Sequence, residues 1–165
     1  MELKTNVLRI LDKNKTKYIS HLYESNGAIS GKEVAESIGK PCSLVYKTLV
    51  TVGKSKKNYV FVIPVCSELD LKKAAAAAGE KSIHMIPQKE LFPLTGYVHG
   101  GCSPIGMKKQ FPTFLHITAK EQRNIMFSAG KIGVQVELSP DDLNKIIHFT
   151  YADVITAEES MDALW

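Results

Sequence analysis

The chain has 165 residues, of which 44% are hydrophobic and 23% are charged, as is usual for a globular protein. No apolar run approaches the roughly 20 residues of a membrane span, and the amphipathic start MELKTNVLRILDKNK lacks the apolar stretch of a signal peptide. We therefore expect a single domain, 1–165, that is cytoplasmic and has no membrane partner. The formal net charge of +4 is compatible with a polyanionic partner without requiring one.

Four segments have the periodicity or the start signal of a helix. They are 2–12, 30–38, 67–78 and a late helix that opens at Ser139. Ser30 and Glu33 have the spacing of a capping box, in which each side chain binds the other residue's amide. Ser67 is placed to cap the alanine-rich helix, which Gly79 ends.

Strand-like runs of β-branched and aromatic residues fill the remainder. They are 18–24, 43–52, 59–65, 82–86, 96–100, 113–118, 124–128, 133–138 and 152–155. The polar turn GKSKKN between the second and third runs predicts a hairpin. Strands and helices do not alternate as βαβ units, so we expect an α+β fold. Its sheet is mixed or mostly antiparallel, curled in a barrel-like way, and flanked by helices.

The cysteines Cys42, Cys66 and Cys102 are odd in number, widely spaced and not arranged as C-x-x-C. This pattern argues against a disulfide framework and against a structural zinc site. The five histidines are scattered as well. We therefore expect no metal site and no other cofactor.

The segment SLVYKTLVTV, 43–52, is typical of a buried strand, but it carries Lys47 in its middle. A lysine among apolar side chains costs free energy unless its ammonium group reaches acceptors or water. Two interpretations remain open. Either the strand lies at the edge of a sheet and the lysine extends into solvent, or Lys47 is a cationic anchor in a pocket. Such an anchor would bind a phosphate, a carboxyl group or a developing oxyanion.

The segment TGYVHGGCSPIG, 95–106, combines Gly100 and Gly101, which permit close backbone approach, with Ser103 in a tight loop. Amides exposed in such a loop can bind an anion or hold a carbonyl group. The segment is not a P-loop, because Met107 stands where the lysine of that motif must be. An ordinary hairpin loop is the alternative.

The segment FSAGKIG, 127–133, lies between two strand candidates and predicts a hairpin turn. In a functional interpretation, Ser128 and the amides around Gly130 close the same pocket as the first loop. Tyr23 ends the first strand with an amphipathic ring that would line a pocket mouth or stack on a base. A tyrosine at the edge of the core is the alternative for that position.

Taken in order, YKTLV, TGYVHGGCSPIG, and FSAGKIG before VQVELSPDDL resemble the YbaK/EbsC-type proteins. These are standalone trans-editing aminoacyl-tRNA deacylases, related to the editing domain inserted in bacterial prolyl-tRNA synthetases. The resemblance covers most of the chain, from the first helix to Ile155. It implies a curled, barrel-like mixed sheet and a hydrolase that removes the wrong amino acid from tRNA.

The resemblance also implies site residues. The family's pocket residues fall here on Tyr23, Lys47, Thr48, Gly100, Gly101, Ser103, Ser128 and Gly130. Lys47 would hold the phosphate or ribose end of the terminal adenosine, and the amides near Gly101 would stabilise charge on the aminoacyl carbonyl. No protein nucleophile is implied, because the thiol of a cysteinyl ester can attack its own carbonyl in a lyase-like cyclisation.

One position departs from the family pattern, since Ile132 stands where relatives often carry a basic residue. That change affects the pocket rim or the grip on tRNA. The substrate implied is Cys-tRNA(Pro), with Cys-tRNA(Cys) as a second, and prolyl-tRNA synthetase is a further implied partner. Three alternatives stay open: an Ala-tRNA(Pro) deacylase of the same family, a non-catalytic RNA- or nucleotide-binding module, and a metal-free hydrolase of small esters.

Overall fold

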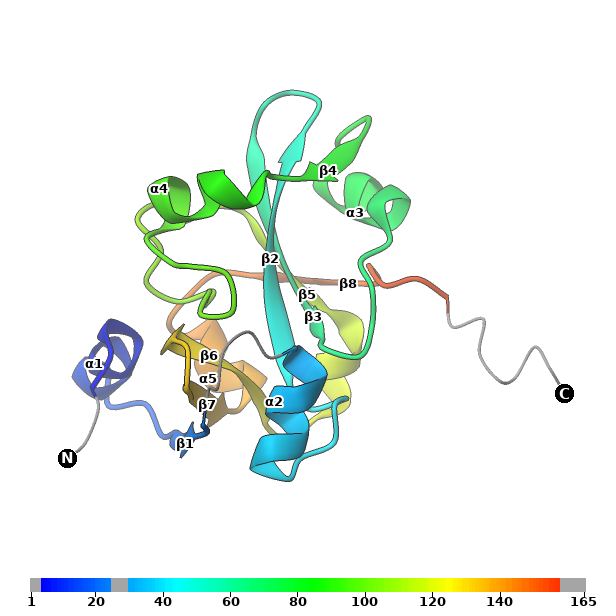
Figure 1. Cartoon of the computed structure of the whole chain (residues 1–165). Helices are drawn as coiled ribbons and strands as arrows, with labels where there is room; N and C mark the ends of the chain where they lie inside the picture. Colours follow the sequence, from blue (N-terminus) through cyan, green and yellow to red (C-terminus); the bar gives the residue numbers. More distant parts are fainter. Residues whose placement is uncertain (1–3, 25–29, 158–165) are drawn as a thin grey trace, which may run out of the picture.

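The computed structural model describes residues 4–24 and 30–157 (Figure 1). Its strands are β1 (Ile19–Leu22), β2 (Tyr46–Gly53), β3 (Asn58–Pro64), β4 (Ile83–Met85), β5 (Thr113–His116), β6 (Ile125–Lys131), β7 (Val134–Leu138) and β8 (Thr150–Ala152). Its helices are α1 (Asn6–Lys13), α2 (Gly31–Ile38), α3 (Leu71–Ala78), α4 (Leu91–Thr95) and α5 (Pro140–Asn144), with the 3-10 turns η1 (Gln88–Glu90) and η2 (Ile117–Glu121). In the described part of the chain, no helix has the length and apolar character needed to cross a membrane.

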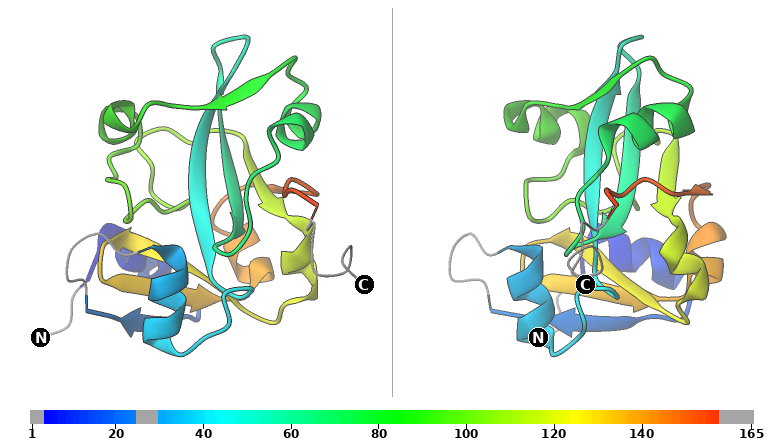
Figure 2. Two further views of the ribbon diagram at one scale, coloured as in Figure 1. Left: turned by 45° about the vertical axis from the view of Figure 1, so that its right-hand side comes forward. Right: turned by 90° about the vertical axis from the view of Figure 1, so that its right-hand side faces the viewer.

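The strands form two sheets, which confirms the predicted α+β class. The smaller sheet has the order β1-β7-β6 and is antiparallel. The larger has the order β4-β2-β3-β5-β8 and is mixed, because β5 runs parallel to both β3 and β8. In Figure 2 the β2–β3 hairpin stands upright over the smaller sheet. The sheets meet at a bridge between Val45 and Met126, but in the described residues they do not close into a barrel.

The main core lies where the two sheets and α1 meet. Alternation along β7 decides which side chains enter it: Val134, Val136 and Leu138 are buried in the main core, whereas Gln135 and Glu137 lie on the opposite face. Burial of aliphatic and aromatic side chains of this size stabilises the fold by about 1.5–3 kcal/mol for each one. One face of the smaller sheet is thereby fixed as core, and its other face is left for polar residues.

Helix α2 begins with the predicted capping box. The Ser30 hydroxyl accepts from the Glu33 amide and the Glu33 carboxylate accepts from the Ser30 amide, both at 3.2 Å. The helix ends at Gly39, whose φ of 78° is the left-handed conformation that glycine adopts without strain. The buried side of α2 packs through Ala35 against Val45, Val65 and Met126, at the junction of the two sheets. This packing makes α2 one wall of the candidate site.

Two predicted boundaries are wrong. Asp70, not Ser67, caps α3, because its carboxylate accepts from the amides of Lys72 and Lys73 at 3.0 Å each. The last strand is Thr150–Ala152 rather than 152–155. Beyond it, Ile155 forms only an isolated bridge with Leu69.

The predicted strand 96–100 is also wrong, because the backbone turns at both of its ends. Gly96 ends α4 with a φ of 85°, and Gly100 has a φ of 88°. Between them, Tyr97 is buried in the core, and its hydroxyl donates to the carbonyl oxygen of Ile105. Tyr97 is thus an anchor for the loop that follows α4.

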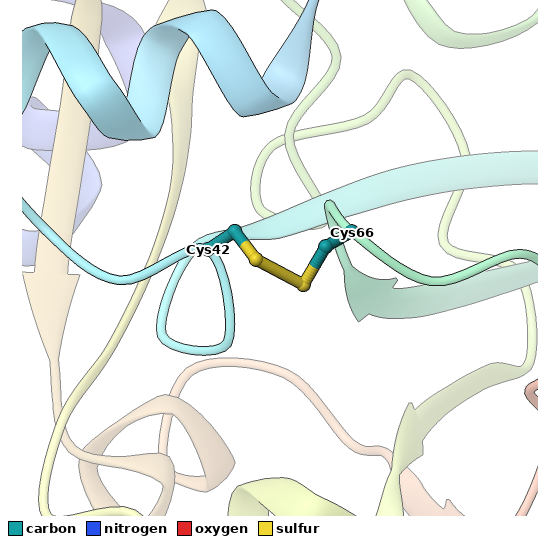
Figure 3. Close-up of a disulfide and its surroundings, with 2 residues drawn as sticks. All are labelled: Cys42 and Cys66. Carbon is teal, nitrogen blue, oxygen red and sulfur yellow. A yellow bond between two sulfur atoms is a disulfide. The ribbon is translucent and has the colours of Figure 1, made fainter. Parts of the chain in front are cut away.

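The expectation that the cysteines form no disulfide is contradicted. Cys42 and Cys66 form one, with 5.6 Å between their Cα atoms (Figure 3). The hairpin explains the pairing: β2 and β3 are antiparallel, and the Val65 amide donates to the Val45 carbonyl at 2.8 Å beyond the open end of the hairpin. Residues just outside both strands therefore come together although they are 24 positions apart in sequence. Cys102 is free and buried.

Candidate active site

A pocket of about 810 Å³ lies between the two sheets, with α2 and the loop after α4 as further walls. Its size is suited to a small organic group such as an aminoacylated nucleoside end. Five of the eight predicted site residues line it, namely Tyr23, Lys47, Thr48, Gly100 and Ser128. Segments far apart in the sequence therefore converge on one pocket: the residue that follows β1, strands β2 and β6, and the loop after α4, residues 96–106, which we call the glycine-rich loop.

The first half of β2 has a free edge, which explains why consecutive residues line one pocket. Toward its end β2 pairs with β4, but only over Thr51, Val52 and Gly53. In the described residues, Tyr46 to Leu49 pair with β3 on one side and with no strand on the other. Side chains from both faces of this edge can then reach the pocket, and both Lys47 and Thr48 do.

Lys47 is half-buried, and among the described residues that line the pocket it is the one lysine or arginine. Burial lowers the pKa of its ammonium group below the usual range, the charge of Glu68 opposes the shift, and that of Lys32 adds to it. Within residues 4–24 and 30–157, no hydrogen bond or ion pair reaches its Nζ atom. The edge-strand interpretation is correct only for this stretch, because further along β2 lies between β4 and β3, and the Lys47 side chain lies at a pocket rather than extending into open solvent. A half-buried cation without a partner is suited to an anionic or oxygen-rich ligand.

Two buried polar atoms in the same pocket also lack partners. They are the hydroxyl Oγ1 of Thr48, which can accept or donate, and the carbonyl Oε1 of Gln135, which accepts; no other buried side-chain polar atom of the described residues is unpaired. Gln135 lies directly opposite Ser128 across the β6–β7 pair. Gln135 is not among the predicted site residues, because a glutamine in the alternating run VQVEL is most simply assigned to a solvent-facing side. Only the packing of α2 and β2 over that face encloses it.

The glycine-rich loop approaches the β6–β7 turn closely. A Cβ atom on Gly101 would lie 3.1 Å from the backbone nitrogen of Ile132, so only glycine fits without a shift. The Gly101 amide donates to the carbonyl of Val98 at 3.0 Å and is therefore engaged within the loop. Gly101 itself does not line the pocket, whereas its neighbours Gly100 and Cys102 do.

The two other predicted residues lie behind the pocket rather than in it. Ser103 is fully buried, and its hydroxyl accepts from the Ile105 amide at 3.3 Å. Gly130 has a φ of 94° and donates its amide to the Ser128 hydroxyl at 3.1 Å. A Cβ atom on Gly130 would lie 3.0 Å from Val7 and Tyr97. Both residues shape the loops that carry pocket residues.

Cys102 is the thiol nearest to the candidate chemistry, and it is poorly suited to act as a nucleophile. Burial raises the pKa of its thiol to about 12, so the thiolate is scarce at neutral pH. Among residues 4–24 and 30–157, no group of three or more His, Cys, Asp or Glu side chains is arranged to hold a metal ion. Cys102 is therefore a poor candidate for a nucleophile in this pocket.

Comparison with known proteins places this geometry in a family. Residues 26–146 match the model of the aminoacyl-tRNA editing domain. A protein of Enterococcus faecalis, named "Putative Cys-tRNA(Pro)/Cys-tRNA(Cys) deacylase EbsC", is 44% identical over 156 residues, 94% of this chain and 95% of that protein. The uncharacterized protein YwhH of Bacillus subtilis is 23% identical over 88% of this chain and 90% of its own length.

Solved structures share the fold. The crystal structure of "a putative trans-editing enzyme for prolyl tRNA synthetase" has a TM-score of 0.78 at 22% identity, covering 94% of this chain and 100% of that one. The hypothetical protein APE2540 has a TM-score of 0.82 at 21% identity, covering 91% and 99%. At such low identity these two structures speak for the fold alone. The family match and the 44% identical relative together show that the chain belongs to the aminoacyl-tRNA editing domain family.

Proposed function

We propose that this protein hydrolyses the ester bond of mischarged aminoacyl-tRNA in trans, with Cys-tRNA(Pro) as its main substrate and Cys-tRNA(Cys) as a second. The name of the 44% identical relative supports this substrate class. The observation that carries the proposal is the half-buried cation Lys47, which has no partner in the described residues and lies in a pocket of suitable size beside unpaired acceptors. Such an editor is useful because binding alone discriminates between small side chains by only about 10- to 200-fold.

In this proposal the pocket binds the aminoacylated 3′ end of the tRNA. Lys47 holds a phosphate or ribose oxygen of the terminal adenosine. Tyr23 covers the mouth with its ring, and Thr48 and Ser128 contact the aminoacyl end. The amides of Gly100 and Cys102 have no acceptor in the described residues, so they, rather than the engaged amide of Gly101, are the candidates to stabilise the oxyanion.

The chemistry then depends on positioning. For a cysteinyl ester, the substrate thiol attacks its own carbonyl carbon, a sulfur–carbon bond forms, and the ester carbon–oxygen bond breaks. The thiol proton passes to the departing ribose oxygen, and water later opens the thiolactone to free cysteine. Holding the thiol and carbonyl in contact contributes a large effective concentration, which lowers the barrier without a protein nucleophile. The poor thiolate character of Cys102 is compatible with this route.

The same proposal places the protein in the cytoplasm, where charged tRNA is used, and gives it prolyl-tRNA synthetase as a partner for tRNA selection. The net charge of +4 favours contact with the acceptor stem. Gly101 positions the glycine-rich loop against the β6–β7 turn, and Ser103 and Gly130 support those loops from behind.

The test is a deacylation assay with Cys-tRNA(Pro), Ala-tRNA(Pro) and Pro-tRNA(Pro), with and without prolyl-tRNA synthetase. Rapid loss of the cysteinyl ester alone supports the proposal. Preference for the alanyl ester assigns the protein to the alternative substrate of the same reaction. Binding of uncharged tRNA without cleavage of any ester contradicts a catalytic role and favours a binding module.

A further inference from the structure

Gln135 has no role in the reaction as described so far, and Thr48 has been given only a general contact with the aminoacyl end. Gln135 is only 6% exposed, and its Oε1 atom has no hydrogen-bond partner in the described residues. Thr48 Oγ1 on the facing sheet is in the same situation. A buried acceptor that has lost water without gaining a donor is unfavourable in the free protein, so such a group indicates a ligand that brings the donor.

The backbone holds Gln135 at the pocket. Val134 and Val136 are buried in the main core on one face of β7, which directs Gln135 to the other face beside its cross-strand partner Ser128. Thr48 comes from the free edge of β2. The two acceptors therefore belong to different sheets and line one space between them.

The charges of the pocket residues indicate which group of a bound aminoacyl ester lies near Lys47 and which lies near Gln135. Lys47 is a cation with donors only, so it repels a positively charged group and attracts oxygen-rich ones. Gln135 is uncharged at every pH, and its carbonyl oxygen can accept from a cation without a charge of its own. An aminoacyl ester has one donor-rich group, its α-ammonium, with three N–H bonds. That group is complementary to the acceptors and not to Lys47.

We propose that Gln135, together with Thr48, binds the free α-ammonium group of the aminoacyl ester and thereby makes an unblocked amino group a requirement of the substrate. The inference rests on the proposed function. An N-acylated ester has lost the positive charge and all but one of the N–H donors, and it must place an acyl group in enclosed space. Esters of peptidyl type are therefore excluded, whereas a simple aminoacyl ester is accepted.

Glu33 is the competing residue for this role, since its carboxylate also belongs to the pocket lining. It is exposed, and its Oε1 atom already accepts from the Ser30 amide in the capping box. Glu33→Gln removes the charge and preserves that box, because glutamine serves equally at this position of the motif. The variant is thus a matched control that distinguishes a contribution of the Glu33 charge from a contribution of Gln135 and Thr48.

The experiment compares kcat/KM for Cys-tRNA(Pro) and N-acetyl-Cys-tRNA(Pro). The wild type is expected to prefer the free amino ester by about 100-fold or more, since a site built for N–H donors rejects an analogue that lacks them. Gln135→Leu is expected to reduce this ratio by about tenfold or more, as is Thr48→Val, which nearly keeps the side-chain shape. Gln135→Glu retains an acceptor and is expected to preserve the ratio, as is Glu33→Gln.

The outcomes distinguish a failure of this inference from a failure of the proposed deacylase function. If the wild type cleaves both esters at equal rates, or if Gln135→Leu and Thr48→Val leave the ratio unchanged, the inference is overturned while the deacylase function stands. A change of the ratio in Glu33→Gln alone transfers the role to Glu33 and also overturns it. If the wild type cleaves neither ester, the proposed function fails and this inference falls with it. Binding of an amide-linked cysteinyl-adenosine, compared with its desamino analogue, provides the same comparison should Gln135→Leu fold poorly.

Discussion

Lys47 and Thr48 are consecutive residues of β2 that point to opposite faces of the strand, yet both line the same pocket. They do so because β2 has no second strand neighbour over this stretch in the described residues. A strand edge is usually a liability in a sheet, since it offers unpaired backbone groups to other chains. Here the edge lies between two sheets beside α2, where it presents a cation and a hydroxyl group to one pocket.

Replacing Lys47 with methionine should stabilise the fold. Burial disfavours the charged ammonium group, which lowers its pKa in the folded protein relative to the unfolded chain. Between the folded and unfolded pKa values the unfolded chain therefore binds more protons than the folded protein. The loss of folding stability caused by the Lys47 charge is fully present below the folded pKa, and it disappears as the pH rises toward 10.5. The gap in Tm between Lys47→Met and wild type is expected to be positive at pH 7 and to shrink toward pH 10. A wild type that is the more stable protein at pH 7 would contradict an unpaired, desolvated Lys47.

Gly101→Ala should impair activity more than stability. The added Cβ atom would lie 3.1 Å from the Ile132 backbone, so the glycine-rich loop must shift away from the β6–β7 turn. Even a small displacement of the neighbouring amides of Gly100 and Cys102 is expected to lower kcat/KM for Cys-tRNA(Pro) by about 10- to 100-fold. Val98→Ala, at an exposed position of the same loop, is the control. Equal activity of Gly101→Ala and wild type would show that the close approach is not needed.

Cys102→Ala should keep most of the activity. The thiol is buried with a pKa of about 12, and only its backbone amide has a place in the proposed reaction. We expect kcat/KM for Cys-tRNA(Pro) to stay within about tenfold of wild type, the cost of a lost methylene-sized contact. A loss of a thousandfold or more, without a matching loss of stability, would identify Cys102 as the nucleophile and refute the substrate-assisted route.

The disulfide between Cys42 and Cys66 should contribute measurably to stability. Its closure over 24 residues restricts the unfolded chain, which predicts a contribution of about 3 kcal/mol. Urea unfolding with and without reductant measures the difference for the wild type. The double variant Cys42→Ser/Cys66→Ser should be less stable than the oxidised wild type, close to the reduced wild type, and unaffected by reductant. A wild type that does not respond to reductant, once loss of the crosslink is verified by thiol counting, would refute the expected contribution.

Local signals predicted much of this fold. The capping box of α2, the β2–β3 hairpin and the turn between β6 and β7 all depend on residues near one another in sequence, and all are confirmed. The segment 96–100 was mispredicted because its apolar residues mimic a strand, whereas Gly96 and Gly100 turn the backbone and Tyr97 anchors it. The residue types of this segment alone could not distinguish a strand from a loop that is anchored by one buried aromatic side chain.

The candidate site depends more on contacts distant in sequence. Lys47 could be singled out from the sequence, because a lysine in an apolar strand requires an explanation. Gln135 could not, since its burial results from α2 and β2 covering a face that an isolated β7 would expose. The pairing of Cys42 with Cys66 likewise depends on the register of the β2–β3 hairpin, which brings the two cysteines together although they are 24 positions apart in sequence.

The most direct test of the central claim is deacylation of Cys-tRNA(Pro) by the wild type and by Lys47→Met, with the fold of both verified by thermal unfolding. We expect the wild type to release cysteine rapidly. Lys47→Met should lower kcat/KM by about 100-fold or more, because the pocket loses the cation that positions the terminal adenosine and the ester is then misplaced. A Lys47→Met protein that cleaves the ester as fast as wild type would contradict the claim that this pocket, with its strand lysine, is the active site.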